Sequence, residues 1–377
     1  MGNTGIAMSS STGAVFYNPA GLATLTHPSI SLSGSNYMYA NLSANGFAYI
    51  DNTSINYGAK AFLPIPSIAA STFRLFNMTE AVSIVVPSLI SLENQTNWKT
   101  PNTNLSVTNY ENSQQIRFGS SLGFFVPNTN EKLSFGFTIF VVRNTEVSSQ
   151  SLQLLFPNGV NSGVFSQVHA NAEVWGINST IGFLYRPDPQ WNLGIKIETP
   201  LLQLYGKADT YNSNQTFNSG TLTGAETPQS NLNANFDLPL DLGLGASYSP
   251  IKSLQFLLDL SFQFANDYIP IENDADGHIT SNFTPRLNVG TEWTFIKHWN
   301  LLTGYFYNPS AMTGANEKDD WMGFTSGLNF ERDQYDMGAG TFYSWSEGHV
   351  AAAVDPTKTA NVSTKIFGAF LTTSYHF

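Results

Sequence analysis

Several stretches of the chain alternate between apolar and polar residues with a period of two. In residues 132–142 (KLSFGFTIFVV) the apolar side chains share one face: Leu133, Phe135, Phe137, Ile139 and Val141. Residues 254–264 (LQFLLDLSFQF) repeat the pattern, with Leu257 as the exception. Successive side chains of a β-strand point to opposite faces, so this alternation predicts strands. Their length suits a tilted strand of ~10 residues that crosses a membrane, and exceeds the ~5–6 residues of most soluble strands.

The same rhythm predicts a series of strands along the chain. The expected strands are 29–40, 54–62, 69–75, 81–89, 115–126, 132–143, 168–177, 179–186, 191–199, 240–248, 253–265, 286–295, 299–307, 323–330, 334–343 and 365–377. Short polar turns such as 127–131 alternate with long expected loops, among them 144–167 and 205–236. Short turns at one end and long loops at the other are typical of outer-membrane barrels. The spacing of Leu152, Leu155 and Phe156 predicts one short helix, over 149–156.

Composition narrows the class of protein further. Of 377 residues, 42% are hydrophobic and 14% aromatic, but only 11% are charged, with a net charge of −11. A soluble enzyme surface is normally built from charge, and a disordered chain would lack the aromatics. The negative charge argues against nucleic acid as a partner. Cysteine is absent, which excludes disulfides, thiolate metal sites and cysteine nucleophiles.

No run approaches the ~18 apolar residues of a membrane helix. Residues 1–10 show no signal peptide, so we expect either a cytosolic chain or one that begins after a removed signal, and the alternation favours the second. Aromatic residues cluster near expected strand ends, as at Trp191, Trp293 and Trp299, which favours interfacial girdles over ordinary core aromatics. The chain ends in GAFLTTSYHF, and Phe377 with its alternating neighbours resembles the closing-strand signal of bacterial outer-membrane barrels.

The first 28 residues do not alternate, but they carry apolar side chains such as Val15, Phe16 and Leu22 that can pack inside another structure. Here the sequence resembles a family. Residues 1–7 (MGNTGIA) and 17–23 (YNPAGLA) are similar to the start of FadL-type outer-membrane transporters of hydrophobic compounds. Residues 239–250, 284–310 and 321–343 also resemble that family, whereas 41–112 do not.

The resemblance implies an all-β fold: a transmembrane antiparallel β-barrel of about fourteen strands (residues 29–377) with a small N-terminal hatch (1–28) as a plug inside. It implies passive transport of long-chain fatty acids or other hydrophobic compounds across the bacterial outer membrane. The outer loops would capture the molecule, a barrel pocket would hold it, and the hatch would control its sideways release into the membrane. The expected partners are hydrophobic small molecules, including fatty acids, lipids and detergent, together with outer-membrane lipid, and a protein partner at the outer loops is a further possibility.

The resemblance also assigns candidate residues. The hatch motif is Asn18, Pro19, Ala20 and Gly21, whose alternative role is a plain structural turn. The candidate ligand-binding residues are Phe16, Tyr17, Leu152, Leu155 and Phe156, and for the last three the alternative is loop packing. Arg74, Arg117 and Arg143 are rare basic residues in expected strands, which would meet either a ligand carboxylate or a barrel acid.

Catalytic and metal-binding motifs are missing from the sequence. There is no HExxH, no GxSxG and no phosphate-binding glycine loop, and the acidic segment 273–278 (NDADGH) lacks the distal Glu of a calcium loop. We therefore expect no enzyme activity, no cofactor and no metal. The competing hypothesis is a structural or secretion-shuttle barrel that holds a protein partner, and an acyl chain inside the barrel would distinguish transport from it.

Overall fold

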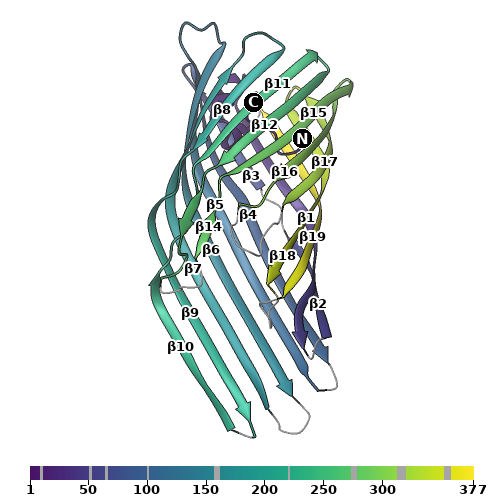
Figure 1. Cartoon of the computed structure of the whole chain (residues 1–377). Coiled ribbons are helices and arrows are strands. Elements are labelled where there is room, and N and C mark those ends of the chain that lie inside the picture. Colours follow the sequence, from purple (N-terminus) through teal and green to yellow (C-terminus); the bar gives the residue numbers. More distant parts are fainter. Residues whose placement is uncertain are drawn as a thin grey trace.

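The computed structural model describes residues 1–8, 12–50, 53–63, 67–99, 102–156, 162–219, 221–272, 278–311, 320–351 and 358–377. Strands make up 78% of it, and they form a closed antiparallel barrel of 14 strands (Figure 1). The β-barrel predicted from the alternation is thus confirmed. Neither of the two short helices in the described residues has the length and hydropathy of a membrane span.

The elements follow one another with few long connections. They are α1 (Ala14–Tyr17), η1 (Pro19–Thr24), β1 (Ser29–Ile50), β2 (Thr53–Leu63), β3 (Ser67–Leu75), β4 (Met78–Lys99), β5 (Asn104–Phe125), β6 (Leu133–Phe156), β7 (Ser162–Tyr185), β8 (Trp191–Glu198), β9 (Leu202–Asn218), β10 (Thr221–Asn233), β11 (Asp241–Ile251), β12 (Leu254–Gln263), β13 (Asn266–Tyr268), β14 (Ile279–Ser281), β15 (Thr284–Ile296), β16 (Trp299–Asn308), β17 (Trp321–Arg332), β18 (Tyr335–Ala351) and β19 (Thr359–His376).

Strand pairing explains how these segments make 14 barrel strands. Three barrel strands are each built from two segments: β2 with β3 beside β1, β8 with β9 beside β7, and β11 with β10 beside β8 and β9. The hairpin of β13 and β14 stands apart from the barrel sheet. The ring closes where β1 pairs with β19, from Ser29 opposite His376 to Asn45 opposite Asn361.

Three of the sequence predictions are wrong, and all three concern the region after residue 143. The expected helix over 149–156 is the end of β6, and the expected loop 144–167 belongs largely to β6 and β7. The expected loop 205–236 is mostly the hairpin of β9 and β10. These strands carry polar residues on both faces, so they lack the contrast on which a period-two pattern depends.

Apolar side chains cover the outside of the barrel and define a membrane belt. On β6, Ile139 and Val141 are 44% and 40% exposed, although their neighbours Phe140 and Val142 are fully buried on the inner face. At the outer boundary, the Arg143 Nε donates to Glu173 Oε1 (2.7 Å), and Trp175 donates to the same oxygen. A charged pair is costly within hydrocarbon, so residues 133–143 of β6 mark the ~10-residue crossing.

Beyond this boundary one side of the barrel continues into the solvent. We call this part the outer extension; it consists of β9, β10 and residues 88–99, 104–115, 144–156 and 162–174 of β4–β7. Figure 1 shows it projecting past the short strands β12, β15, β16 and β17. The exposed aromatics Trp191, Trp293 and Trp299 lie at the other end of the barrel from the outer extension, where short turns join the strands.

Candidate functional site

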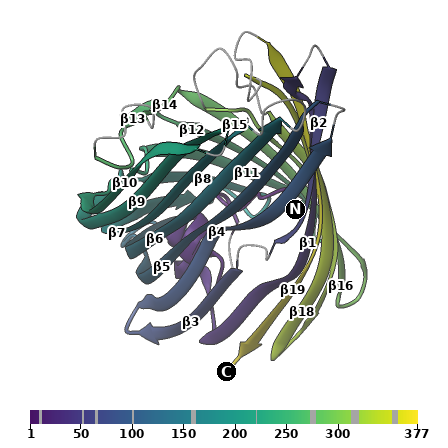
Figure 2. The same cartoon turned by 90° about the horizontal axis from the view of Figure 1, so that it is seen from below.

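The N-terminal segment, residues 1–25, contacts the inner face of the barrel wall. Figure 2 shows its helical turns within the ring of strands, and η1 packs against β4, β5, β6 and β7. The hydroxyl of Ser134 on β6 donates to Ala20 O (3.0 Å), and that of Thr138 donates to Val15 O (3.1 Å). The segment is therefore bonded to the wall, whereas its action as a plug remains a prediction.

Asn18 joins the two helical turns of this segment. It ends α1 and caps η1, where its Oδ1 accepts from the Ala20 N–H (3.1 Å). Its Nδ2 donates to Ile6 O (2.7 Å) and to Phe183 O of β7 (3.1 Å), and the residue is fully buried. Pro19 follows at the first position of η1, where its missing N–H costs nothing. The motif thus ties the segment to itself and to the wall.

Inward-facing glycines form the surface on which the segment rests. A Cβ at Gly182 would lie 2.0 Å from Asn18 Oδ1, and one at Gly136 would lie 2.1 Å from the Pro19 carbonyl carbon. At Gly194 it would lie 2.2 Å from Ile6 O, and at Gly304 2.2 Å from the Gly2 nitrogen. These contacts are shorter than any side chain tolerates. The strands therefore need glycine here, because the N-terminal segment lies directly against their backbones.

Asp259 of β12 holds the start of the segment from another part of the wall. Its Oδ2 accepts from the Gly5 N–H (2.6 Å) and the Ile6 N–H (3.0 Å), and the residue is 1% exposed. Burial, with the nearby Asp259 charge, raises the pKa of Tyr17 to about 12. The Tyr17 hydroxyl therefore stays protonated and donates to Asn3 Oδ1 (2.9 Å).

An apolar layer crosses the barrel interior next to the N-terminal segment. Val85, Phe140 and Val142 are its fully buried centre, with at most 1% exposure. Phe16 from α1, Ile68 from β3 and Leu201 from the β8–β9 connection pack against them. We call this set the central layer. Phe16 is the one predicted ligand-binding residue within it, and it meets Tyr17 edge-on at 5.4 Å between ring centroids.

A charged cluster borders the central layer. Glu198 of β8 accepts from Arg117 Nη1 (2.5 Å), Lys196 Nζ (2.9 Å) and Asn178 Nδ2 (3.1 Å). Arg117 and Lys196 also lie 5.7 Å and 5.2 Å from the Phe16 ring centroid, which is cation–π range. Further along the inner wall, Arg286 pairs with Asp241. The sequence left either a ligand carboxylate or a barrel acid as the partner of Arg117, and in the structure that partner is the barrel acid Glu198.

The outer mouth holds a second apolar set, which we call the mouth cluster. Leu105 and Val107 of β5 are 2% and 1% exposed, and Trp98, Leu152 and Leu154 pack against them. Trp98 also packs against the cluster around Ala44 of β1. Apolar surface thus borders the interior at the mouth and again at the central layer.

The three candidates on β6 do not share a face. Leu152 lies opposite Val107 and belongs to the mouth cluster. Phe156 has the same parity as Leu152 and is 38% exposed, whereas Leu155 alternates to the other face of the sheet. The grouping of all three on one side was derived from a helix and fails with it. Their ligand-binding role remains a prediction.

Sequence reasoning singled out Arg117 and Phe16 but missed their partners. Lys196 and Glu198 stand two residues apart in a strand, which places them on one face, and this was the available signal. Their contact with Arg117 depends on the registers of three strand pairs, β5 with β6, β6 with β7 and β7 with β8, which the sequence does not reveal. Asp259 and the glycines were missed for the same reason. Residues 273–277 lie outside the described residues. In the part of the chain that the structure describes, no group of three or more His, Asp and Glu side chains is placed to hold a metal ion.

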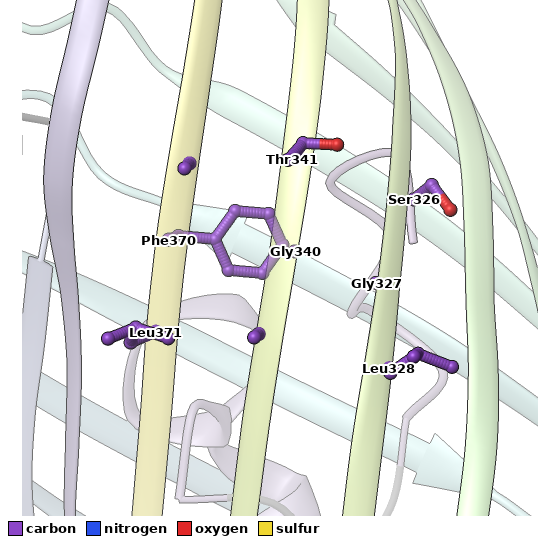
Figure 3. A pocket seen from close by; sticks show the side chains of 9 residues that line it. Ser326, Gly327, Leu328, Gly340, Thr341, Phe370 and Leu371 are labelled. Atoms are coloured by element: carbon purple, nitrogen blue, oxygen red, sulfur yellow. The ribbon is translucent and has the colours of Figure 1, made fainter.

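Two depressions lie on the lipid-facing side of the wall rather than in its interior. Figure 3 shows one of about 420 Å³ on β17, β18 and β19, among Leu328, Gly340 and Leu371. The other, about 720 Å³, is bordered by exposed residues such as Ile30, Ile84 and Phe118. Both sit where outward side chains are small, and they belong to the membrane belt.

Several solved structures have the same fold as this chain. A Pseudomonas aeruginosa FadL homologue has a TM-score of 0.67 at 14% identity, over 99% of this chain and 96% of its own. The Pseudomonas putida toluene transporter TodX has a TM-score of 0.67 at 17% identity, over 100% and 97%. The monoaromatic hydrocarbon channel CymD has a TM-score of 0.64 at 15% identity, over 100% and 96%. The chain therefore has the FadL-type barrel fold. No family model and no curated protein matches the sequence.

Proposed function

We propose that the protein is a bacterial outer-membrane channel that passes hydrophobic small molecules, with the N-terminal segment as its hatch. The observation that carries this proposal is the central layer, in which Phe16 of the segment completes an apolar surface with Val85, Phe140 and Val142 of the wall. Solved structures of this fold include a toluene transporter and a monoaromatic hydrocarbon channel, which supports the same class of cargo. Neither the cargo nor the step needs covalent chemistry.

The path begins at the mouth cluster and ends at the central layer. A molecule leaves water for the surface around Trp98 and Leu152, and then moves inward to Phe140 and Phe16. Each buried CH₂ contributes about 0.8 kcal/mol, so an aromatic ring or an acyl chain gains enough affinity from apolar contact alone. Long-chain fatty acids and aromatic hydrocarbons both satisfy this requirement.

Release follows movement of the hatch. In this proposal Asn18 and Pro19 set the position of η1, which packs against β4. β4 carries Pro87, and its register with β5 shifts between Val85 and Ser88. A proline and a register shift weaken strand pairing locally, so this part of the wall suits sideways passage into the bilayer. The molecule then enters outer-membrane lipid rather than water.

Two tryptophan substitutions on β6 test transport. Val142→Trp fills the central layer, whereas Val147→Trp makes the same change on the opposite face, beyond the membrane belt. In proteoliposomes we expect Val142→Trp to reduce transfer of labelled toluene and of labelled 1-dodecanol at least about tenfold, and Val147→Trp to leave it within twofold. Heat-dependent gel mobility confirms that each barrel is folded.

Equal transfer by the two folded variants would contradict passage through the central layer. If the unmodified protein transfers neither compound and instead retains a protein partner on purification, the shuttle hypothesis replaces the channel.

A further inference from the structure

We propose that the cargo crosses the central site as an uncharged molecule, and that the charged cluster discriminates against carboxylates. This rests on the proposed function, because it names the class of compound that the channel accepts. The proposal combines three observations: paired cations beside the central layer, additional acidic groups along the inner wall, and buried polar atoms without a partner.

The cations beside the central layer already have acidic partners. In the described part of the chain three basic side chains reach this depth. Arg117 and Lys196 bind Glu198, and Arg286 binds Asp241. The Arg117 side chain is 7% exposed, and those of Lys196 and Glu198 are 11% exposed. An incoming carboxylate would have to compete with a buried barrel acid for them.

Additional acidic groups line the way to and past this cluster. Asp259 faces the same interior from β12, and among the described residues it accepts hydrogen bonds from the Gly5 and Ile6 N–H groups of the N-terminal segment. On the outer side, alternation from Arg117 and Phe140 places Glu111 of β5 and Glu146 of β6 on the inner face. The inner wall therefore carries more acids than bases, and its field repels an approaching anion.

Electrostatics decides between the two kinds of cargo. A carboxylate loses its hydration on entering a dry site, and only a free cation or several donors would compensate for that loss. At the central layer Arg117 and Lys196 each donate one hydrogen bond to Glu198, and Arg117 Nε donates to Gln115 Oε1, so both cations already have polar partners. An uncharged molecule loses only the water around its apolar surface, which favours binding. A cationic cargo would meet Arg117 and Lys196 at the Phe16 ring, where like charges repel.

The unpartnered polar atoms indicate which neutral group fits. Asn178 Oδ1 and Thr180 Oγ1 face the interior from β7, and both residues are 1% exposed. In the described structure neither atom has a hydrogen-bond partner. A buried acceptor without a donor is unfavourable, so a hydroxyl group on the cargo would gain from meeting one here. Hydrocarbons and their alcohols are therefore the class that this site fits.

Three probes of equal chain length test the inference. Binding of 1-dodecanol, dodecanoate and dodecylammonium to the purified full-length barrel is measured at pH 8 by equilibrium dialysis in one detergent. We expect 1-dodecanol to bind at least about tenfold more tightly than dodecanoate and than dodecylammonium. Equal or tighter binding of either charged probe overturns the inference but leaves the channel intact. If no probe binds, the proposed function itself fails.

Charge variants supply a gain-of-function test. Glu198→Gln frees Arg117 and Lys196, so dodecanoate binding should strengthen about tenfold or more, while 1-dodecanol stays within threefold. Asp241→Asn frees Arg286 and provides a second variant if the first does not fold. Glu173→Gln is the matched control, because it frees Arg143 on the outer surface and should leave the selectivity unchanged. Unchanged dodecanoate binding in a folded Glu198→Gln or Asp241→Asn barrel overturns the inference.

Discussion

At the scale of single residues, the site depends on glycines of the wall against which the N-terminal segment packs directly. Gly182 is one of them, and the side chain of Asn18 lies against it. The sequence predicts the role of Asn18, because Asn before Pro marks a turn. It does not predict that of Gly182, since the need for glycine at 182 arises from residue 18, far away in the chain.

Gly182→Ala should displace the N-terminal segment. The new Cβ would lie 2.0 Å from Asn18 Oδ1, so the Asn18 bonds to Ile6 and Phe183 must break or shift. Losing buried hydrogen bonds costs about 1–3 kcal/mol. We expect faster proteolysis within residues 1–25 of the folded barrel. Gly34→Ala is the control, because nothing lies within 4 Å of its Cβ, and equal proteolysis of the two variants would contradict the seating.

At the scale of elements, the sequence predicts the membrane crossings well and the solvent-exposed parts poorly. Residues 132–143 were predicted as a strand and form the crossing part of β6. Two pairs of predicted strands each correspond to a single barrel strand. Residues 54–62 and 69–75 occupy one barrel position as β2 and β3, and residues 168–177 and 179–186 belong to the one strand β7. Lipid enforces alternation, and water does not, so the pattern fades where β6 leaves the belt.

Removal of residues 1–25 tests the hatch as an element. The segment contacts β6 and β7 through η1 and β12 through Asp259, so it spans much of the interior. We expect the deleted barrel to conduct ions in planar bilayers, whereas the full chain conducts little, because water fills the vacated space. Conductance that does not change, in a barrel with normal heat-dependent mobility, would show that the segment is not a plug.

At the scale of the whole molecule, the barrel has two kinds of apolar exterior. Ile139 and Leu155 both point outward from β6 and are similarly exposed, at 44% and 38%. They differ in height, since Arg143 and Glu173 mark the membrane boundary between them. Exposure alone therefore does not identify a lipid contact, and the position along the strand decides.

Arginine substitutions should separate these two environments. Ile139→Arg places a charge in the belt and should destabilise the barrel by about 2–4 kcal/mol. Leu155→Arg lies in the outer extension, where a charge meets water, and should change stability by less than about 0.5 kcal/mol. Urea-induced unfolding in lipid vesicles measures both. Equal losses would move the membrane boundary outward beyond residue 155.

The seating of the first residues also constrains the order in which the barrel is assembled. The Gly2 N–H donates to Thr325 of β17, Asp259 of β12 holds Gly5, and Ser134 of β6 bonds Ala20. Strands that are distant in sequence thus converge on one short stretch that leads directly into β1. β1 in turn pairs with β19, so the ring closes around the segment. Once the ring is closed, the N-terminal segment could reach its bonds to these strands only if the pairing of β1 with β19 opened again. We therefore expect the N-terminal segment to take its place before β1 and β19 complete the ring.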